Sequence, residues 1–188
     1  MDRRNWLRAL ALTPLTGFAG SWMARPAFAK GEKAVEELQK NWKSLLAKGA
    51  DVAGGAEPLK LSDAEWKKRL SPATYDVLRR EGTEPPGTSP LDQEKRAGVF
   101  VCAGCRLPLF TSAMKFDSGT GWPSFFTTIP DAVRTKRDFK LILPRTEYHC
   151  ARCGGHQGHR FDDGPEPTGL RYCNNGVALA FIPKTGKV

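Results

Sequence analysis

The sequence has few cysteines, few histidines and no long apolar run, and each shortage narrows what the chain can be. Its 188 residues include five cysteines and three histidines, while 40% are hydrophobic and 26% charged. That balance is typical of an ordinary globular domain and excludes a fibre. The mildly apolar stretch at residues 9–20 is broken by threonine, proline and glycine. Because a membrane helix needs about 20 apolar residues, no spanning helix is predicted.

Charge of one sign is not gathered into any long run. The formal net charge is +9, and four arginines near the N-terminus contribute to it: Arg3, Arg4, Arg8 and Arg25. Elsewhere basic residues are interspersed with acids, as in residues 33–40 and 63–69. Mixed charges are typical of a solvated surface, whereas binding to a nucleic acid requires clustered cations. We therefore do not expect DNA or RNA as a partner.

Residues 1–29 resemble an export signal. Arg3 and Arg4 form a twin-arginine pair, an apolar stretch follows, and residues 27–29 read Ala-Phe-Ala, an A-x-A cleavage site. A membrane anchor or an amphipathic helix is the alternative. We predict export by the twin-arginine machinery to the periplasm or the exterior, with cleavage after Ala29. Since that route carries folded proteins, a metal site assembled in the reducing cytosol would arrive protected from disulfide formation.

Helix signals occupy the next part of the chain. An apolar stripe over residues 32–48, stopped by Gly49, predicts one amphipathic helix, and residues 50–56 then read as a flexible linker. A capping box at residues 62–65 and a Ser-Pro start at residues 71–72 predict two further helices, the second ending at residues 81–82. We therefore divide the chain into a signal (1–29), a helix with its linker (30–56) and one domain (57–185).

Short β-prone runs punctuated by Gly, Pro and Asp fill the remainder of the chain. They lie at residues 99–101, 107–110, 125–126, 139–143, 145–149, 170–173 and 177–182. The predicted fold is mainly β, of the α+β class, with two small antiparallel sheets preceded by N-terminal helices.

Four of the five cysteines form two C-x-x-C pairs, Cys102 with Cys105 and Cys150 with Cys153. Two such pairs are typical of a four-thiolate zinc knuckle, and four thiolates fill the tetrahedron, which favours a structural over a catalytic zinc. Iron in a rubredoxin-like site, or two redox-active dithiols, are the alternatives. Both pairs fall at the ends of predicted strands. A metal there would staple the sheets together.

One cysteine, Cys173, is left without a partner. A lone cysteine is more often a small buried hydrophobe than a nucleophile, so its surroundings decide the matter. Three segments are unusual for a plain zinc-stapled domain: a glycine-bounded loop with Trp122, a segment with His156 and His159, and the run around Cys173 itself. Taken singly, each of them has an ordinary structural explanation.

Taken together and in order, these motifs resemble those of the B-type methionine sulfoxide reductases, which reduce the R epimer. The matching patterns are Cys-x-x-Cys, Phe-Asp-Ser-Gly-x-Gly-Trp-Pro-Ser-Phe, Cys-x-x-Cys-Gly-x-His-x-Gly-His and Arg-Tyr-Cys-x-Asn, spread over residues 59–183. The resemblance implies a β-rich fold with one structural zinc on Cys102, Cys105, Cys150 and Cys153. It also implies a nucleophile at Cys173 and an active site that includes Trp122, His156, His159 and Asn175.

These residue types suit the implied chemistry. A thiolate is a soft nucleophile for sulfur, and Arg171, two positions before Cys173 on a strand, would lower the thiol pKa from the same face. His159 and His156 can hold a proton for the departing oxygen. Trp122 can receive the S-methyl group as positive charge builds on sulfur, with Phe161 as a second substrate-binding ring. Asn175 would orient a water or a histidine, and Cys173 would end as a sulfenic acid.

The chain departs from the family pattern at two positions. Thr120 stands where many relatives carry a second, resolving cysteine, and Gly176 stands where relatives often have serine, a change expected to be minor. With the knuckle cysteines holding zinc, no thiol remains to resolve the sulfenic acid internally. A low-molecular thiol or a thioredoxin-like donor must then reduce it. The alternative is resolution by Cys102 or Cys105 with loss of the metal.

We therefore predict a monomeric, exported enzyme that repairs oxidised methionine residues of proteins. The rival hypothesis is a non-enzymatic zinc-ribbon interaction module, which would keep its function without the Cys173 thiol. A dithiol oxidoreductase that uses its C-x-x-C pairs is the third possibility, and it would hold little metal.

Overall fold

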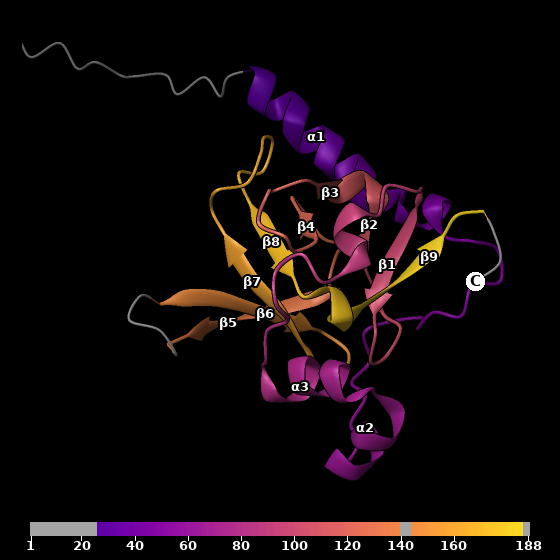
Figure 1. The fold of residues 1–188 in the computed structure, drawn as a ribbon. Helices are drawn as coiled ribbons and strands as arrows, with labels where there is room; N and C mark the ends of the chain where they lie inside the picture. The colour runs from indigo at the N-terminus through magenta and orange to yellow at the C-terminus, as the bar shows by residue number, and fades with distance from the viewer. Residues whose placement is uncertain (1–25, 140–143, 186–188) are drawn as a thin grey trace, which may run out of the picture.

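The computed structural model describes residues 26–139 and 144–185. The predicted twin-arginine segment lies outside these residues. The chain begins with α1 (Pro26–Lys40), which lies along one side of the domain, while α2 (Asp63–Arg69) and α3 (Pro72–Arg80) cover the opposite end (Figure 1). No helix in the described ranges is long and apolar enough to cross a membrane.

Two antiparallel sheets form the body of the domain, as predicted. The smaller sheet has the strand order β2 (Pro108–Thr111), β1 (Gly98–Cys102) and β9 (Leu179–Pro183). The larger has the order β3 (Lys115–Phe116), β4 (Ser124–Phe125), β8 (Arg171–Asn174), β7 (His156–Phe161), β6 (Arg145–Cys150) and β5 (Val133–Asp138). Four short 3-10 turns connect these elements: η1 (Trp42–Leu45), η2 (Pro90–Gln93), η3 (Ser112–Met114) and η4 (Gly176–Ala178).

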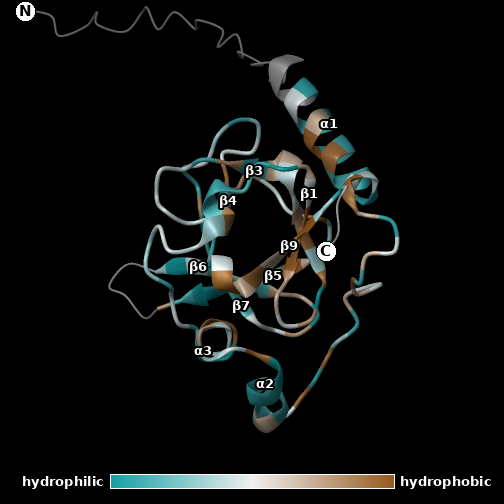
Figure 2. Cartoon of the chain, turned by 45° about the vertical axis from the view of Figure 1, so that its right-hand side comes forward, coloured by the Kyte–Doolittle hydropathy of each residue, from teal (hydrophilic) through white to brown (hydrophobic). Residues whose placement is uncertain are grey.

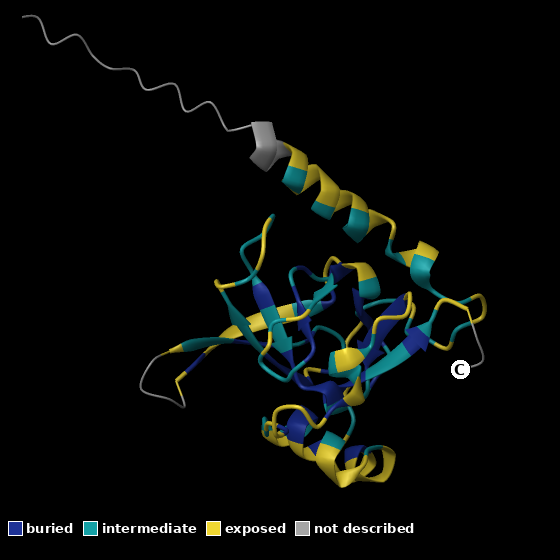
Figure 3. Cartoon of the chain, turned by 45° about the horizontal axis from the view of Figure 1, so that its top comes forward, coloured by how far each residue is buried: buried dark blue, intermediate teal, exposed yellow. Residues whose placement is uncertain are grey.

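Aromatic rings join the two sheets into one core. Phe125 of the larger sheet stacks on Phe110 at 4.0 Å and meets the edge of Phe100 at 5.0 Å, and both partners belong to the smaller sheet. All three side chains are fully buried. Apolar residues therefore gather on β1 and β9, whereas α2 is hydrophilic (Figure 2), and exposed residues follow the outer face of α1 (Figure 3).

The capping signals are confirmed. Ser62 accepts a hydrogen bond from the Glu65 backbone, and the Glu65 carboxylate accepts one from the Ser62 backbone, so that α2 begins with the complete capping box. Ser71 caps α3 in the same position, and α3 ends where Glu81 takes the left-handed conformation. These two helices carry the chain to the loop that borders the candidate site.

The helix predicted over residues 32–48 is wrong in its second half. The α-helix ends at Lys40, and a 3-10 turn, η1, follows Asn41. Trp42 and Leu45 of this turn pack against the core, as Leu38 of α1 does. Tertiary packing therefore overrides the helical periodicity here.

Residues 50–56, predicted as a flexible linker, are bound to the first C-x-x-C turn, and Leu59, just after them, is bound to the second. The Ala53 N–H donates to the carbonyl of Arg106 at 3.0 Å, and the Leu59 N–H donates to the carbonyl of Arg152 at 2.8 Å. Each arginine belongs to or directly follows a C-x-x-C pair. This part of the chain thus contacts both C-x-x-C turns.

The strand expected at residues 139–143 is not found where it can be examined. Phe139 lies outside any strand and is 72% exposed, and residues 140–143 lie outside the described ranges. The strand lies instead just before, at β5, where charged residues follow one another. Charged residues have a weak propensity for β-structure, but here they pair with β6 in full register. An edge strand also tolerates exposed charged side chains. β3 and the central strand β7 were likewise not predicted.

Candidate active site

The four knuckle cysteines come together between the two sheets. Cys102 ends β1 and Cys150 ends β6, as the sequence predicted, and the Sγ atoms of all four cysteines lie within 4.8 Å of one another. The Cys102–Cys153 and Cys105–Cys150 pairs are 3.7 and 3.4 Å apart. Tetrahedral zinc–thiolate bonds of about 2.3 Å separate sulfurs by roughly 3.8 Å, so this buried cluster fits a metal.

Gln157 connects this cluster to the strand that carries Cys173. Its side-chain Nε2 donates to Cys102 Sγ at 3.5 Å, and its Oε1 accepts from Asn174 Nδ2 at 3.4 Å. Its backbone carbonyl accepts from both the N–H and the Nδ2 of Asn175. Gln157 is completely buried, so these contacts exclude water. A donor to a thiolate is a common outer partner of a metal ligand.

Cys173 lines a pocket of about 120 Å³. Cavities of about 150 Å³ hold a molecule the size of benzene, so the pocket has room for the end of one side chain. Most of the predicted site residues line it together: Trp122, His159, Phe161, Cys173 and Asn175. Thr83, Arg145, Gly158 and Asn174 complete the lining, and none of these four was predicted.

Strand β7 approaches β8, the strand that carries Cys173, closely at this point. His159 is the cross-strand partner of Cys173, and Gly158 is the partner of Asn174. A Cβ at Gly158 would overlap the Cys173 carbonyl. Only glycine therefore lets the two strands meet beside the thiol.

Arg171 is placed as the sequence predicted but is held by an acid. It donates two hydrogen bonds of 2.8 Å to Asp163, and its guanidinium stacks 4.3 Å from the centre of the Phe161 ring. Burial raises the pKa of the Cys173 thiol, and the nearby Arg171 lowers it only in part. Arg171 therefore acts on the thiol pKa in the predicted direction, but desolvation of the partly buried Cys173 outweighs it, so the net shift is upward.

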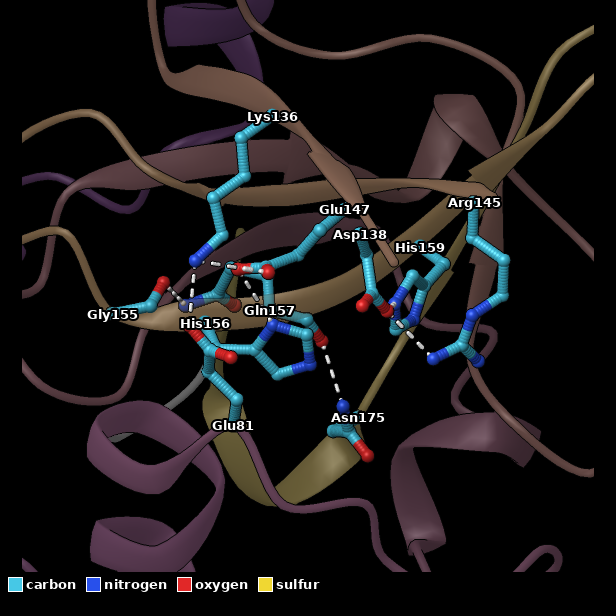
Figure 4. Close-up of polar contacts among 10 residues, drawn as sticks. All are labelled: Glu81, Lys136, Asp138, Arg145, Glu147, Gly155, His156, Gln157, His159 and Asn175. Atoms are coloured by element: carbon cyan, nitrogen blue, oxygen red, sulfur yellow. Dashed lines mark hydrogen bonds and ion pairs between the residues drawn. The ribbon is translucent and has the colours of Figure 1, made fainter. Parts of the chain in front are cut away.

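His159 is bound to Asp138, a residue that the sequence gave no reason to select. Its Nε2 lies 2.8 Å from Asp138 Oδ2, which also accepts a 2.7 Å hydrogen bond from Arg145 (Figure 4). Burial lowers the pKa of His159, and the bond to Asp138 raises it only in part. The neutral ring then carries its proton on Nε2, which leaves Nδ1 as the basic nitrogen.

His156 lies behind His159, outside the pocket lining. A bulge at Gln157 turns both rings toward each other, with centroids 5.5 Å apart. His156 Nδ1 is 3.0 Å from the buried Glu147, a short distance that lacks hydrogen-bond geometry, and Lys136 lies 3.1 Å from the same carboxylate (Figure 4). His156 therefore packs against the His159 ring and does not line the pocket.

Trp122 and Asn175 are held by the loop after α3. The indole Nε1 of Trp122 donates to the Glu84 carbonyl at 3.1 Å, and Asn175 Oδ1 accepts from the Glu84 N–H at 3.0 Å. Asn175 Nδ2 donates to the Gln157 carbonyl at 3.0 Å. The Asn175 amide thus binds backbone at both ends, where we expected it to orient a water or a histidine.

Comparison with known proteins agrees with this geometry. A family model described as the SelR domain matches residues 70–183. The peptide methionine sulfoxide reductase MsrB of Leifsonia xyli subsp. xyli is 49% identical over 136 residues, covering 71% of this chain and 98% of that protein. This chain belongs to the MsrB family of peptide methionine sulfoxide reductases. The chloroplastic peptide methionine sulfoxide reductase B1 of Arabidopsis thaliana is 52% identical over 180 residues, covering 95% of this chain and 88% of its own length.

The two departures from the MsrB pattern lie beside the thiol and its strand. The hydroxyls of Thr120 and Ser124 both interact with Cys173, and Ser118 Oγ lies 2.8 Å from each hydroxyl. The position of the absent second cysteine is therefore next to Cys173. At Gly176, a Cβ would overlap the Ser89 side chain, so glycine fits the packing of this chain, and the minor effect expected of this change stays a prediction.

The buried position of Cys173 predicts a pH-dependent thiol. Because burial raises its pKa, the thiolate fraction is small at neutral pH and grows with pH. In the metal-loaded protein, alkylation of Cys173 by iodoacetamide is expected to accelerate about tenfold per pH unit from pH ~6 to ~8. Mass spectrometry of the labelled protein measures this rate, with Cys173→Ser as the unlabelled control. A rate that levels off below pH ~7 would contradict it.

Proposed function

We propose that this protein reduces the R epimer of methionine sulfoxide in peptides and proteins, with Cys173 as the nucleophile. The observation that carries the proposal is the position of Cys173. It is the one cysteine outside the knuckle cluster, and it lines a side-chain-sized pocket together with Trp122, Phe161 and His159. A pocket open to the surface suits an oxidised methionine on a peptide.

The reaction transfers one oxygen atom to Cys173. The neutral His159 takes the thiol proton and the thiolate attacks the sulfoxide sulfur, which forms a sulfur–sulfur bond. The sulfoxide oxygen gains the proton from His159 and leaves as hydroxide. The hydroxide then attacks Cys173 Sγ, and the sulfur–sulfur bond breaks with its electron pair on the methionine sulfur. Cys173 is oxidised to a sulfenic acid and the substrate is reduced to methionine. Trp122 faces the S-methyl group, and its ring stabilises the positive charge that develops on sulfur by about 0.5 to 2 kcal/mol.

We further propose that the four knuckle cysteines bind one structural Zn²⁺. Their number, burial and mutual distances support this ion, and a closed four-thiolate shell supplies no open position for substrate. The metal would hold the two sheets together at the ends of β1 and β6. Reduction of the sulfoxide then depends on side chains of this chain that lie outside the metal site.

We propose that an external thiol, either a low-molecular one or a thioredoxin-like protein, reduces the sulfenic acid. Thr120 beside Cys173 offers a hydroxyl where a second thiol would be needed, and the knuckle cysteines are buried away from the pocket. We also propose export by the twin-arginine machinery with cleavage after Ala29. That cleavage would remove the first residues of α1 and leave the rest of the helix on the domain.

Turnover of separate R and S epimers of a methionine sulfoxide peptide, with dithiothreitol as reductant, tests the function. We expect reduction of the R epimer only, and Cys173→Ser is expected to lower turnover by at least about a thousandfold, as removal of other nucleophiles does. Full turnover by Cys173→Ser would show that Cys173 is not the nucleophile, whereas no turnover by folded and metal-loaded wild-type protein would favour the interaction module instead.

A further inference from the structure

Glu84 stands in the loop between α3 and the first sheet with its carboxylate buried. It is 7% exposed, and both of its oxygens accept backbone hydrogen bonds from the turn that follows β8. Oε1 accepts from the Gly176 N–H, and Oε2 accepts from the Val177 N–H at 3.1 Å. A buried carboxylate is tolerated where its oxygens are satisfied in this way.

The backbone of the same residue binds two further parts of the pocket. The carbonyl of Glu84 accepts the indole N–H of Trp122, and the N–H of Glu84 donates to the side chain of Asn175. Four hydrogen bonds from one residue therefore join the Trp122 loop to the end of the strand that carries Cys173.

Gly176, in the turn that Glu84 binds, is closely packed against its neighbours. A Cβ at Gly176 would overlap the Ser89 side chain and would lie 3.2 Å from Glu84 Oε1. The turn is thus pressed against Glu84 and Ser89 on one side. On the other side, Asn175 is bound to the Gln157 carbonyl. The end of β8 is therefore held from two sides.

We propose that Glu84 is a positioning residue that sets the distance between Cys173 and the Trp122 ring. It touches neither the substrate nor the reacting sulfur. Its carboxylate holds the turn three residues after Cys173, while its carbonyl holds the indole against which the S-methyl group rests. This inference rests on the proposed role of Cys173 as nucleophile.

Glu84→Gln tests the carboxylate with almost no change of shape. The amide keeps one acceptor but sets its NH₂ group against the other backbone N–H, so the turn must shift. Because displacements of about 1 Å can cost a hundredfold in rate, we expect kcat/KM to fall by about 10- to 100-fold, mostly in kcat. The exposed Glu57→Gln is the matched control and is expected to behave as wild type.

Three further measurements separate positioning from simple stabilisation. Zinc content and thermal melting verify that Glu84→Gln is folded at the assay temperature, and iodoacetamide labelling reports Cys173 directly. We expect a changed labelling rate in the folded variant. A lowered melting temperature with unchanged kcat, KM and labelling rate would overturn the proposal. A wild-type protein without turnover would instead overturn the proposed function, which keeps the two failures distinct.

If Glu84→Gln does not fold, Trp122→Phe tests the other arm of the contact. This change keeps an aromatic ring but removes the N–H that binds the Glu84 carbonyl. We expect KM for the sulfoxide peptide to rise about tenfold or more, while the labelling rate of Cys173 stays as in wild type. An unchanged KM would show that the indole contact does not position the ring.

Discussion

Replacing Cys150 by serine, or removing the metal with a chelator, is expected to unfold this protein. The four thiolates join the end of β1 in one sheet to the end of β6 in the other, and they are buried. Structural zinc sites contribute about 10 to 16 kcal/mol to folding in small domains, which matches or exceeds the roughly 5 to 15 kcal/mol by which such domains are stable. The hydroxyl of serine is a poor substitute for a thiolate.

Zinc content and circular dichroism melting measure this effect together. We expect Cys150→Ser to bind far less than one equivalent of zinc and to lose its cooperative melting transition. Cys173→Ser is the matched control, because it removes a thiol outside the cluster, and it should bind a full equivalent and melt as wild type does. A Cys150→Ser protein that retained both zinc and its melting temperature would rule out the metal staple.

Thr120→Cys is expected to give the protein an internal disulfide that the wild type cannot form. The Thr120 hydroxyl interacts with Cys173, so a thiol at this position would meet the sulfenic acid directly. The new thiol displaces the oxygen as water and forms a sulfur–sulfur bond with Cys173. The disulfide, rather than the sulfenic acid, then becomes the species that the external reductant must reduce.

One equivalent of substrate without added reductant distinguishes the two outcomes by mass spectrometry. The wild type should gain one oxygen atom, whereas Thr120→Cys should lose two hydrogen atoms. Thr120→Ser keeps the hydroxyl and should gain one oxygen like the wild type. Oxygen gain without disulfide formation in Thr120→Cys would show that position 120 cannot reach Cys173.

The cysteine cluster and the place of Cys173 apart from it were predictable from the sequence, because both depend on rare residues in fixed spacing. Cys102 and Cys150 fall at strand ends as expected, and the two Ser-based caps locate α2 and α3. These features are determined by residues that lie close together in the chain. They can therefore be predicted without knowing which strands pair.

The supporting residues were not predictable in the same way. Glu84, Asp138 and Gln157 are common polar residues whose partners lie far away in the chain, so no local pattern distinguishes them from surface residues. β5 was missed because its charges argue against a strand, and only its register with β6 explains it. The net shift of the Cys173 thiol pKa also depends on how deeply the side chain is buried, which a sequence does not specify.

The order of strands in the smaller sheet has a consequence for synthesis of the protein. β1 lies between β2 and β9, so its second edge stays unpaired until β9, the last of the described strands, has been made. The Cys102 turn therefore leaves the ribosome long before the Cys150 turn that completes the cluster. The four-cysteine cluster can therefore form only after residue 153 has been made, and until then Cys102 and Cys105 lack their two partners in it.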